Sequence, residues 1–133
     1  MAERVYCLYR GKDQESILMQ KNACHDFAEK KGWNIVGEEQ EIGVSGYKVS
    51  TDDLVKLKRI RKAAEQGEFD ILLVFMYDRL GRNLNETPFI AGWFTKKGIH
   101  VWSVYEGEII DGVDAERMLD YIRFWQTDEA QKL

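Results

Sequence analysis

The run from Asp70 to Met76, DILLVFM, constrains the fold more than any other segment of the chain. After Asp70 every residue is apolar, so the run lacks the alternation expected of a strand with one face in water. A short unbroken apolar run is typical of a strand buried on both faces of a parallel sheet. The sequence therefore predicts a sheet with helices packed on both of its faces.

Strand-like and helix-like segments alternate along the rest of the chain. Apolar runs rich in β-forming residues predict strands at residues 4–9, 33–36, 70–76 and 100–105. Apolar residues at helical spacing predict helices at residues 16–31, 51–66, 87–97 and about 113–131. Ser16 is expected to cap the first helix and Gly32 to end it. This order predicts a three-layer α/β domain with a central, mainly parallel sheet of four or five strands.

Size and composition place the chain among ordinary globular domains. Its 133 residues suffice for one domain with a substantial core. No apolar run has membrane-spanning length and the N-terminus lacks a signal-peptide pattern, so we expect a cytoplasmic protein without a membrane partner. Cys7 and Cys24 lack the CxxC spacing and lie in apolar segments, which predicts buried free thiols.

The charge balance limits how the chain could meet DNA. The formal net charge is −4 at pH 7, which is unfavourable for binding phosphates over the whole surface. A DNA-binding role would need a local concentration of Lys and Arg, or further segments outside this chain. The basic run from Lys56 to Lys62 would spread over the surface of a helix, so we expect a solvated face there, with DNA contact as the alternative.

The segment Asp78-Arg79-Leu80-Gly81-Arg82 follows the buried strand directly. Functional groups in such folds collect at the carboxyl ends of the strands. Arg79 and Arg82 are three residues apart, so in a helical turn their guanidinium groups would point the same way. Arg10 ends the first strand and would join them if the first and third strands are neighbours. Convergent guanidinium groups suit phosphate oxygens. For the segment alone, a surface turn held by salt bridges is the alternative.

Ordered blocks of the sequence resemble the catalytic domain of the serine site-specific recombinases, the resolvase/invertase class. The blocks are SILMQKNACHDFAEKKGWNIV, GVSGYKV, FDILLVFMYDRLGRN and KKGIHVWSVYEG. They cover most of the chain, and the likeness is greatest to recombinases of mobile elements. The resemblance implies a resolvase-like domain over residues 1–133, whose last ~20 residues start an oligomerisation helix. It also implies DNA-binding regions outside this chain.

The activity that the resemblance implies is DNA strand cleavage and exchange. A serine of each subunit attacks a phosphodiester, which gives a 5′-phosphoserine link and a free 3′-hydroxyl. The partners implied are DNA and further copies of the chain, as a dimer and as a tetramer on DNA. No metal, ATP or other cofactor is implied.

The resemblance also assigns roles to individual residues. The catalytic residues implied are Arg10, Asp78, Arg79 and Arg82. The supporting residues implied are Gln20, Glu41, Ser45 and Asp70, and Lys48 stands in for a DNA-binding arginine. Self-association is expected through an apolar stripe on the last helix, formed by Met118, Tyr121, Ile122 and Trp125.

The nucleophilic serine itself is not visible in this sequence. The family's first loop runs Tyr-x-Arg-x-Ser, but here Lys12 occupies the serine's place. Ser16 lies four residues before Gln20, the place of a helix-opening serine, which favours capping over attack. The loop is also several residues shorter than the family's. Either a natural deletion has inactivated the domain, or a segment between Arg10 and Gly11 is absent from this sequence. We favour the second.

Two other functions stay open at this point. The chain could be a catalytically inactive, recombinase-like interaction module that assembles through its last helix. It could also be a metal-dependent phosphoryl-transfer domain that uses Asp78 and Glu106. The neighbouring arginines would repel a cation and disfavour the metal hypothesis.

Overall fold

The computed structural model describes residues 2–42, 55–80 and 87–109. Along the chain these form β1 (Arg4–Gly11), α1 (Gln14–Lys31), β2 (Asn34–Ile42), α2 (Val55–Glu65), β3 (Ile71–Val74), the 3₁₀ turn η2 (Tyr77–Arg79), α3 (Thr87–Lys96), β4 (His100–Ser103) and β5 (Gly107–Ile109). The sheet has the strand order β2-β1-β3-β4-β5. Its pairs are parallel except β4 with β5, which is antiparallel. The predicted α/β class and mainly parallel sheet are confirmed.

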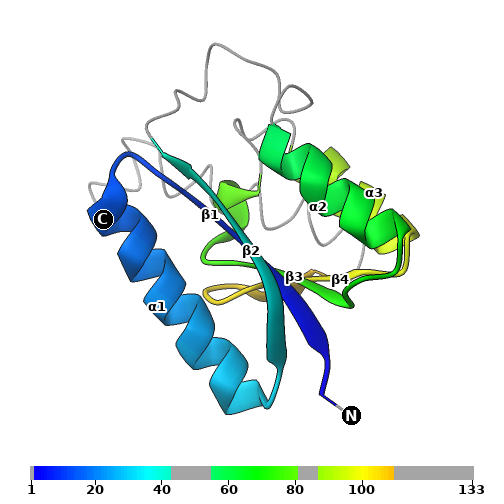
Figure 1. The fold of residues 1–133 in the computed structure, drawn as a ribbon, viewed down its shortest axis with the longest axis horizontal. Coiled ribbons are helices and arrows are strands. Elements are labelled where there is room, and N and C mark those ends of the chain that lie inside the picture. The colour runs from blue at the N-terminus through cyan, green and yellow to red at the C-terminus, as the bar shows by residue number, and fades with distance from the viewer. Residues whose placement is uncertain (1, 43–54, 81–86, 110–133) are drawn as a thin grey trace, which may run out of the picture.

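Helices cover both faces of the sheet, as Figure 1 shows, with α1 on one side and α2 and α3 on the other. Side chains from alternate positions of the strands enter the two cores. Val5, Cys7 and Leu73 belong to the core under α1, whereas Leu8 and Leu72 belong to the core under α2 and α3. All four residues of β3 are buried. The first four residues of the unbroken apolar run, Ile71–Val74, are therefore a strand between two cores, as predicted.

The first helix begins earlier than predicted, so the cap prediction for Ser16 is wrong. Asp13 is the N-cap residue, and its carboxylate accepts a hydrogen bond of 2.8 Å from the Ser16 backbone N–H. A carboxylate at a helix N-terminus also meets the positive end of the helix dipole, which favours Asp13 over a hydroxyl. Gly32 ends the helix in the left-handed conformation, as predicted, with φ of 73°.

Several strands differ from the sequence prediction. β3 ends at Val74 and β4 at Ser103, before the predicted ends at residues 76 and 105. β2 extends to Ile42, well past the predicted end at Val36. It is an edge strand in which exposed and half-buried residues alternate, so its polar run EEQE did not look like a strand. β5 follows β4 after a short turn and was not expected as a separate element. The predicted loop 43–47 and the helix at about 113–131 lie outside the described residues.

Cys7 and Cys24 are free and buried, as predicted. Among residues 2–42, 55–80 and 87–109, none of the helices combines the length and the hydrophobicity of a membrane span.

The double burial of β3 leads to a stability prediction. Leu72→Ala should lower the free energy of unfolding by about 2–5 kcal/mol, because a fully buried side chain leaves a cavity between packed layers. Leu18→Ala, the same change at a residue 57% exposed on α1, should alter it by less than about 0.5 kcal/mol. Chemical denaturation measures both. Equal losses would contradict the burial of β3 between two cores.

Candidate active site at the carboxyl edge of the sheet

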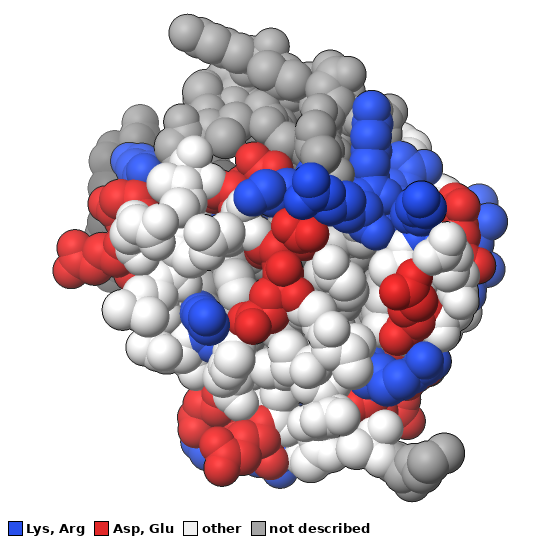
Figure 2. Space-filling model, in the orientation of Figure 1, with Lys and Arg blue, Asp and Glu red and all other residues white. Residues whose placement is uncertain are grey.

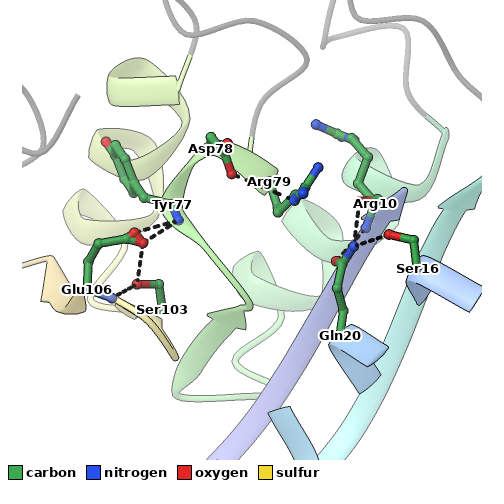
Figure 3. Close-up of polar contacts among 8 residues, drawn as sticks. All are labelled: Arg10, Ser16, Gln20, Tyr77, Asp78, Arg79, Ser103 and Glu106. Carbon is green, nitrogen blue, oxygen red and sulfur yellow. Dashed lines mark hydrogen bonds and ion pairs between the residues drawn. The ribbon is translucent and has the colours of Figure 1, made fainter. Parts of the chain in front are cut away.

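The predicted catalytic residues meet where two central strands end. β1 and β3 are neighbouring parallel strands, so their carboxyl ends lie at one edge of the sheet. Arg10 lies near the end of β1, and Asp78 and Arg79 lie in η2, directly after β3. Figure 3 shows the Arg79 side chain between Asp78 and Arg10. The structure therefore brings together three of the four residues to which the resemblance assigns catalytic roles.

Asp78 and Arg79 form an ion pair with a long separation. The Asp78 Oδ1 and Arg79 Nε atoms are 3.7 Å apart, too far for a hydrogen bond. Both atoms are buried, and neither has a hydrogen-bond partner among the described residues. Because buried polar atoms are ordinarily hydrogen-bonded, this pair has unused capacity for a polar ligand. A phosphate oxygen would suit the guanidinium.

The end of β1 is fixed by Gln20 of α1. This side chain is fully buried, its Oε1 accepts from the Arg10 backbone N–H at 3.1 Å, and its Nε2 donates to the Arg10 carbonyl at 2.8 Å. The amide thus satisfies both backbone groups of Arg10, as a neighbouring strand would. The supporting role expected of Gln20 takes a definite form, since it holds the backbone from which the Arg10 guanidinium projects (Figure 3).

Ser16 lies at this same edge. Its Oγ accepts a hydrogen bond of 3.3 Å from Gln20 Nε2. A Cβ added to Gly11 would come within 2.5 Å of Ser16 Oγ, so the hydroxyl packs directly against the end of β1.

The position at which the family has its nucleophile is occupied by Lys12, which is exposed between β1 and α1. β1 continues from Arg10 to Gly11, which pairs with Ile42 of β2, so this junction shows no interruption and an inserted loop would have to break the strand. A longer loop in the parent gene stays a prediction.

Of the other supporting residues, Glu41 lies at this edge and Asp70 does not. Glu41 pairs with Arg10 in the register of β1 and β2. Asp70 precedes β3 and therefore lies at the opposite edge. There its carboxylate accepts from the Arg4 side chain and from the Arg4 backbone N–H, both at 2.9 Å. The Arg4 guanidinium lowers the pKa of Asp70. This expectation needs correction, because Asp70 fastens β3 to β1 far from the arginines.

Several expected residues lie outside the described part of the chain. They are Arg82, Ser45, Lys48, Met118, Tyr121, Ile122 and Trp125.

Sequence reasoning missed Tyr77 and Ser103 and considered Glu106 only as a metal ligand. Glu106 accepts from the Tyr77 backbone N–H with both carboxylate oxygens and from the Ser103 hydroxyl. In the described residues, no three His, Cys, Asp or Glu side chains lie close enough to hold a metal ion. The signal that could have identified Glu106 is its place after β4, equivalent to that of Asp78 after β3.

Positive charge on the described surface gathers on α2, whose basic residues are Lys56, Lys58, Arg59, Arg61 and Lys62. In Figure 2 a band of Lys and Arg side chains lies over the part of this face where α2 runs, with acidic side chains beside it. Two of these basic residues contact other side chains of the domain. Arg61 lies over the Trp93 ring at 4.6 Å from its centroid, and Arg59 approaches Glu39 at 3.9 Å. The expectation that the charges spread over the helix is consistent with these contacts.

A comparison with known protein families identifies the family of this chain. A family described as "Resolvase, N terminal domain" matches residues 10–129. The chain belongs to this family. Its members are the catalytic domains of serine recombinases, which cleave and exchange DNA strands. No curated protein sequence matched the chain.

Solved structures of an integrase domain and of site-specific recombinases have a similar fold. The N-terminal catalytic domain of TP901-1 integrase is 25% identical with a TM-score of 0.73, and the match covers 93% of this chain and 96% of that one. A resolvase family site-specific recombinase from Streptococcus pneumoniae is 19% identical with a TM-score of 0.72, covering 98% and 92%. The C-terminal catalytic domain of ISC1926 TnpA, an IS607-like serine recombinase, is 22% identical with a TM-score of 0.66, covering 90% and 79%.

The contacts of Gln20 predict a cost for removing its amide. Gln20→Met keeps the size of the side chain but leaves buried backbone groups of Arg10 unpaired, so it should lower the free energy of unfolding by about 1–3 kcal/mol. Gln14→Met, at an exposed position of the same helix, should change it by less than about 0.5 kcal/mol. Denaturation curves that coincide for the two variants would show that the amide does not hold β1.

Proposed function

We propose that this chain is the catalytic domain of a site-specific serine recombinase that binds the scissile DNA phosphate at the carboxyl edge of β1 and β3. The observation that carries the proposal is the meeting of Arg10 with Asp78 and Arg79 at that edge. Arg82 is the fourth member by resemblance. Guanidinium groups bind phosphate oxygens through charge-assisted hydrogen bonds, and they keep their charge at any working pH.

The proposed reaction exchanges one ester for another. A serine Oγ attacks phosphorus, the bond from phosphorus to the 3′-oxygen breaks, and the DNA end stays attached as a 5′-phosphoserine. The serine loses one proton and the 3′-oxygen gains one, so the step is balanced. Arg10 and Arg79 would stabilise the negative charge of the pentavalent transition state. The reverse step with a new 3′-hydroxyl rejoins the strands and needs no metal or ATP.

The nucleophile in this proposal comes from a segment of the parent gene between Arg10 and Gly11. Two observations favour that origin over Ser16. The Ser16 hydroxyl is engaged by Gln20 and packs against Gly11, and in Figure 3 it lies beside the Arg10 backbone while the guanidinium points away from it. Sequencing the parent gene across this junction tests the origin. An uninterrupted Arg10–Gly11 codon pair would leave Ser16 as the candidate or the domain inactive.

We further propose that the parent protein serves a mobile element and acts as a dimer that becomes a tetramer on DNA. An integrase and an IS607-like serine recombinase are among the proteins with the same fold. The net charge of −4 supports DNA-binding regions beyond these 133 residues.

One observation favours the second candidate, a catalytically inactive interaction module. Lys12 stands in the serine's place, and the connection from β1 to α1 holds no hydroxyl before Ser16. Such a module would keep the fold and lose the chemistry. Incubation of the parent protein with its own site DNA discriminates the two, because only the enzyme forms a covalent protein–DNA adduct.

The proposed phosphate site makes a prediction about Arg79. In the parent protein, Arg79→Ala should slow cleavage of site DNA by about 100- to 1,000-fold, because it removes a donor to the transition state. Gel assays of DNA cleavage measure the rate.

Arg4→Ala is the matched control. Arg4 lies at the opposite edge of the sheet in an exposed pair with Asp70, so its loss should leave cleavage nearly unchanged. If Arg79→Ala cleaves DNA as fast as the native protein, Arg79 has no part in the reaction.

A further inference from the structure

Glu106 lies in the turn between β4 and β5, beside the loop that carries Asp78 and Arg79. The turn is fastened to the end of β3 by backbone hydrogen bonds, from Val104 N–H to the Val74 carbonyl at 2.9 Å and from Tyr105 N–H to the Phe75 carbonyl at 3.2 Å. Ser103, which is fully buried, accepts from the Glu106 backbone N–H at 2.8 Å and donates its hydroxyl to Glu106 Oε1 at 3.2 Å. The carboxylate therefore has a defined position.

Both oxygens of this carboxylate reach the start of η2. Glu106 Oε1 and Oε2 accept from the Tyr77 backbone N–H at 2.9 and 3.1 Å. Met76, the N-cap residue of η2, contributes no side-chain hydrogen bond to the turn. Glu106 thus supplies, from the turn after β4, the acceptor that a local Ser, Asp or Asn would ordinarily provide.

The placement is electrostatically costly. Burial raises the pKa of Glu106 and the nearby Asp78 carboxylate raises it further, while the bonds from Tyr77 and Ser103 lower it. A neutral residue of similar size would avoid this cost if Glu106 served packing alone. Both of its carboxylate oxygens accept from the Tyr77 backbone N–H, which indicates that Glu106 holds the backbone of this loop.

We propose that Glu106 is a positioning residue that fixes η2, and with it Asp78 and Arg79, in the orientation that faces Arg10. The functional part of this inference rests on the proposed phosphate site, whereas the structural part does not. Glu106 acts on the Tyr77 N–H and touches neither substrate nor reacting atoms. Its counterpart is Gln20, which fixes the backbone of Arg10 across the same edge.

The first test follows hydrogen exchange of the backbone amides in the native chain and in Glu106→Ala. The η2 amides are those of Arg79 and Leu80, bonded to the carbonyls of Met76 and Tyr77. In Glu106→Ala we expect their exchange to accelerate about tenfold or more by local opening, while the amide of Leu72 in β3 keeps its rate. Unchanged exchange at Arg79 and Leu80 would overturn the proposal.

Glu106→Gln keeps the inference testable if the alanine variant fails to fold. Its carbonyl oxygen still accepts from Tyr77 N–H, so protection of the η2 amides should be largely restored. Because the pKa of the Glu106 carboxyl is raised in the folded state, the native protein loses stability as pH rises through that pKa. The Glu106→Gln variant, whose amide is uncharged, does not lose this stability. The stability of Glu106→Gln relative to the native chain should therefore increase with pH across this range. Glu108→Gln on β5 is the matched control. In this variant the η2 amides should exchange at the native rate.

The functional readout uses inorganic phosphate as the probe, with the Arg79 Nε–Hε resonance followed by NMR. Glu106→Ala should weaken phosphate binding about tenfold, because an Arg79 guanidinium that is held less firmly loses more freedom on binding. Glu106→Gln should recover most of the affinity. If the native chain shows no phosphate effect at Arg79, the proposed function fails while the exchange result still decides the role of Glu106. If phosphate binds equally to all variants, the positioning role is wrong and the phosphate site stands.

Discussion

The parallel pairing of β1 with β3, between two cores, is the constraint on which the rest of the structure depends. It places Val5 to Leu8 beside Ile71 to Val74 and thereby brings the carboxyl ends of the two strands together. Residues separated by almost 70 positions in the sequence, Arg10 and Arg79, reach one edge only because of this register. The apolar side chains on both faces fix the register, since a shift by one residue would exchange the two cores.

Polar side chains from outside the two strands then fix the backbone at their ends. Gln20 satisfies the amide and carbonyl of Arg10, and Glu106 satisfies the amide of Tyr77. In both cases a side chain from outside the strand forms hydrogen bonds with the main chain at the strand's end. The edge therefore combines rigid backbone positions with the unused polar atoms of Asp78 and Arg79. Such preorganisation is what electrostatic stabilisation of a transition state requires.

The sequence predicted the layers of the fold because hydrophobic pattern records burial directly. The apolar run of β3 located the central strand, and Asp78 and Arg79 after it located the edge of the sheet that we propose as the phosphate site. The role of Asp70 was carried over from the resemblance, but its position directly before Ile71 puts it at the amino end of β3, where it pairs with Arg4. The cap was assigned to Ser16 rather than Asp13 because both residues can cap, and backbone geometry decides between them. Glu106 could not be assigned because its bond to Tyr77 joins turns that follow different strands.

The central claim is that this edge holds a DNA phosphate during attack by a serine. The most direct measurement is mass spectrometry of the covalent adduct formed by the parent protein on its own site DNA carrying a nick that prevents rejoining. The account predicts a 5′-phosphate linked to a serine in the peptide that joins Arg10 to α1. An adduct on a residue elsewhere in the chain, or cleavage that leaves no covalent adduct, would contradict it.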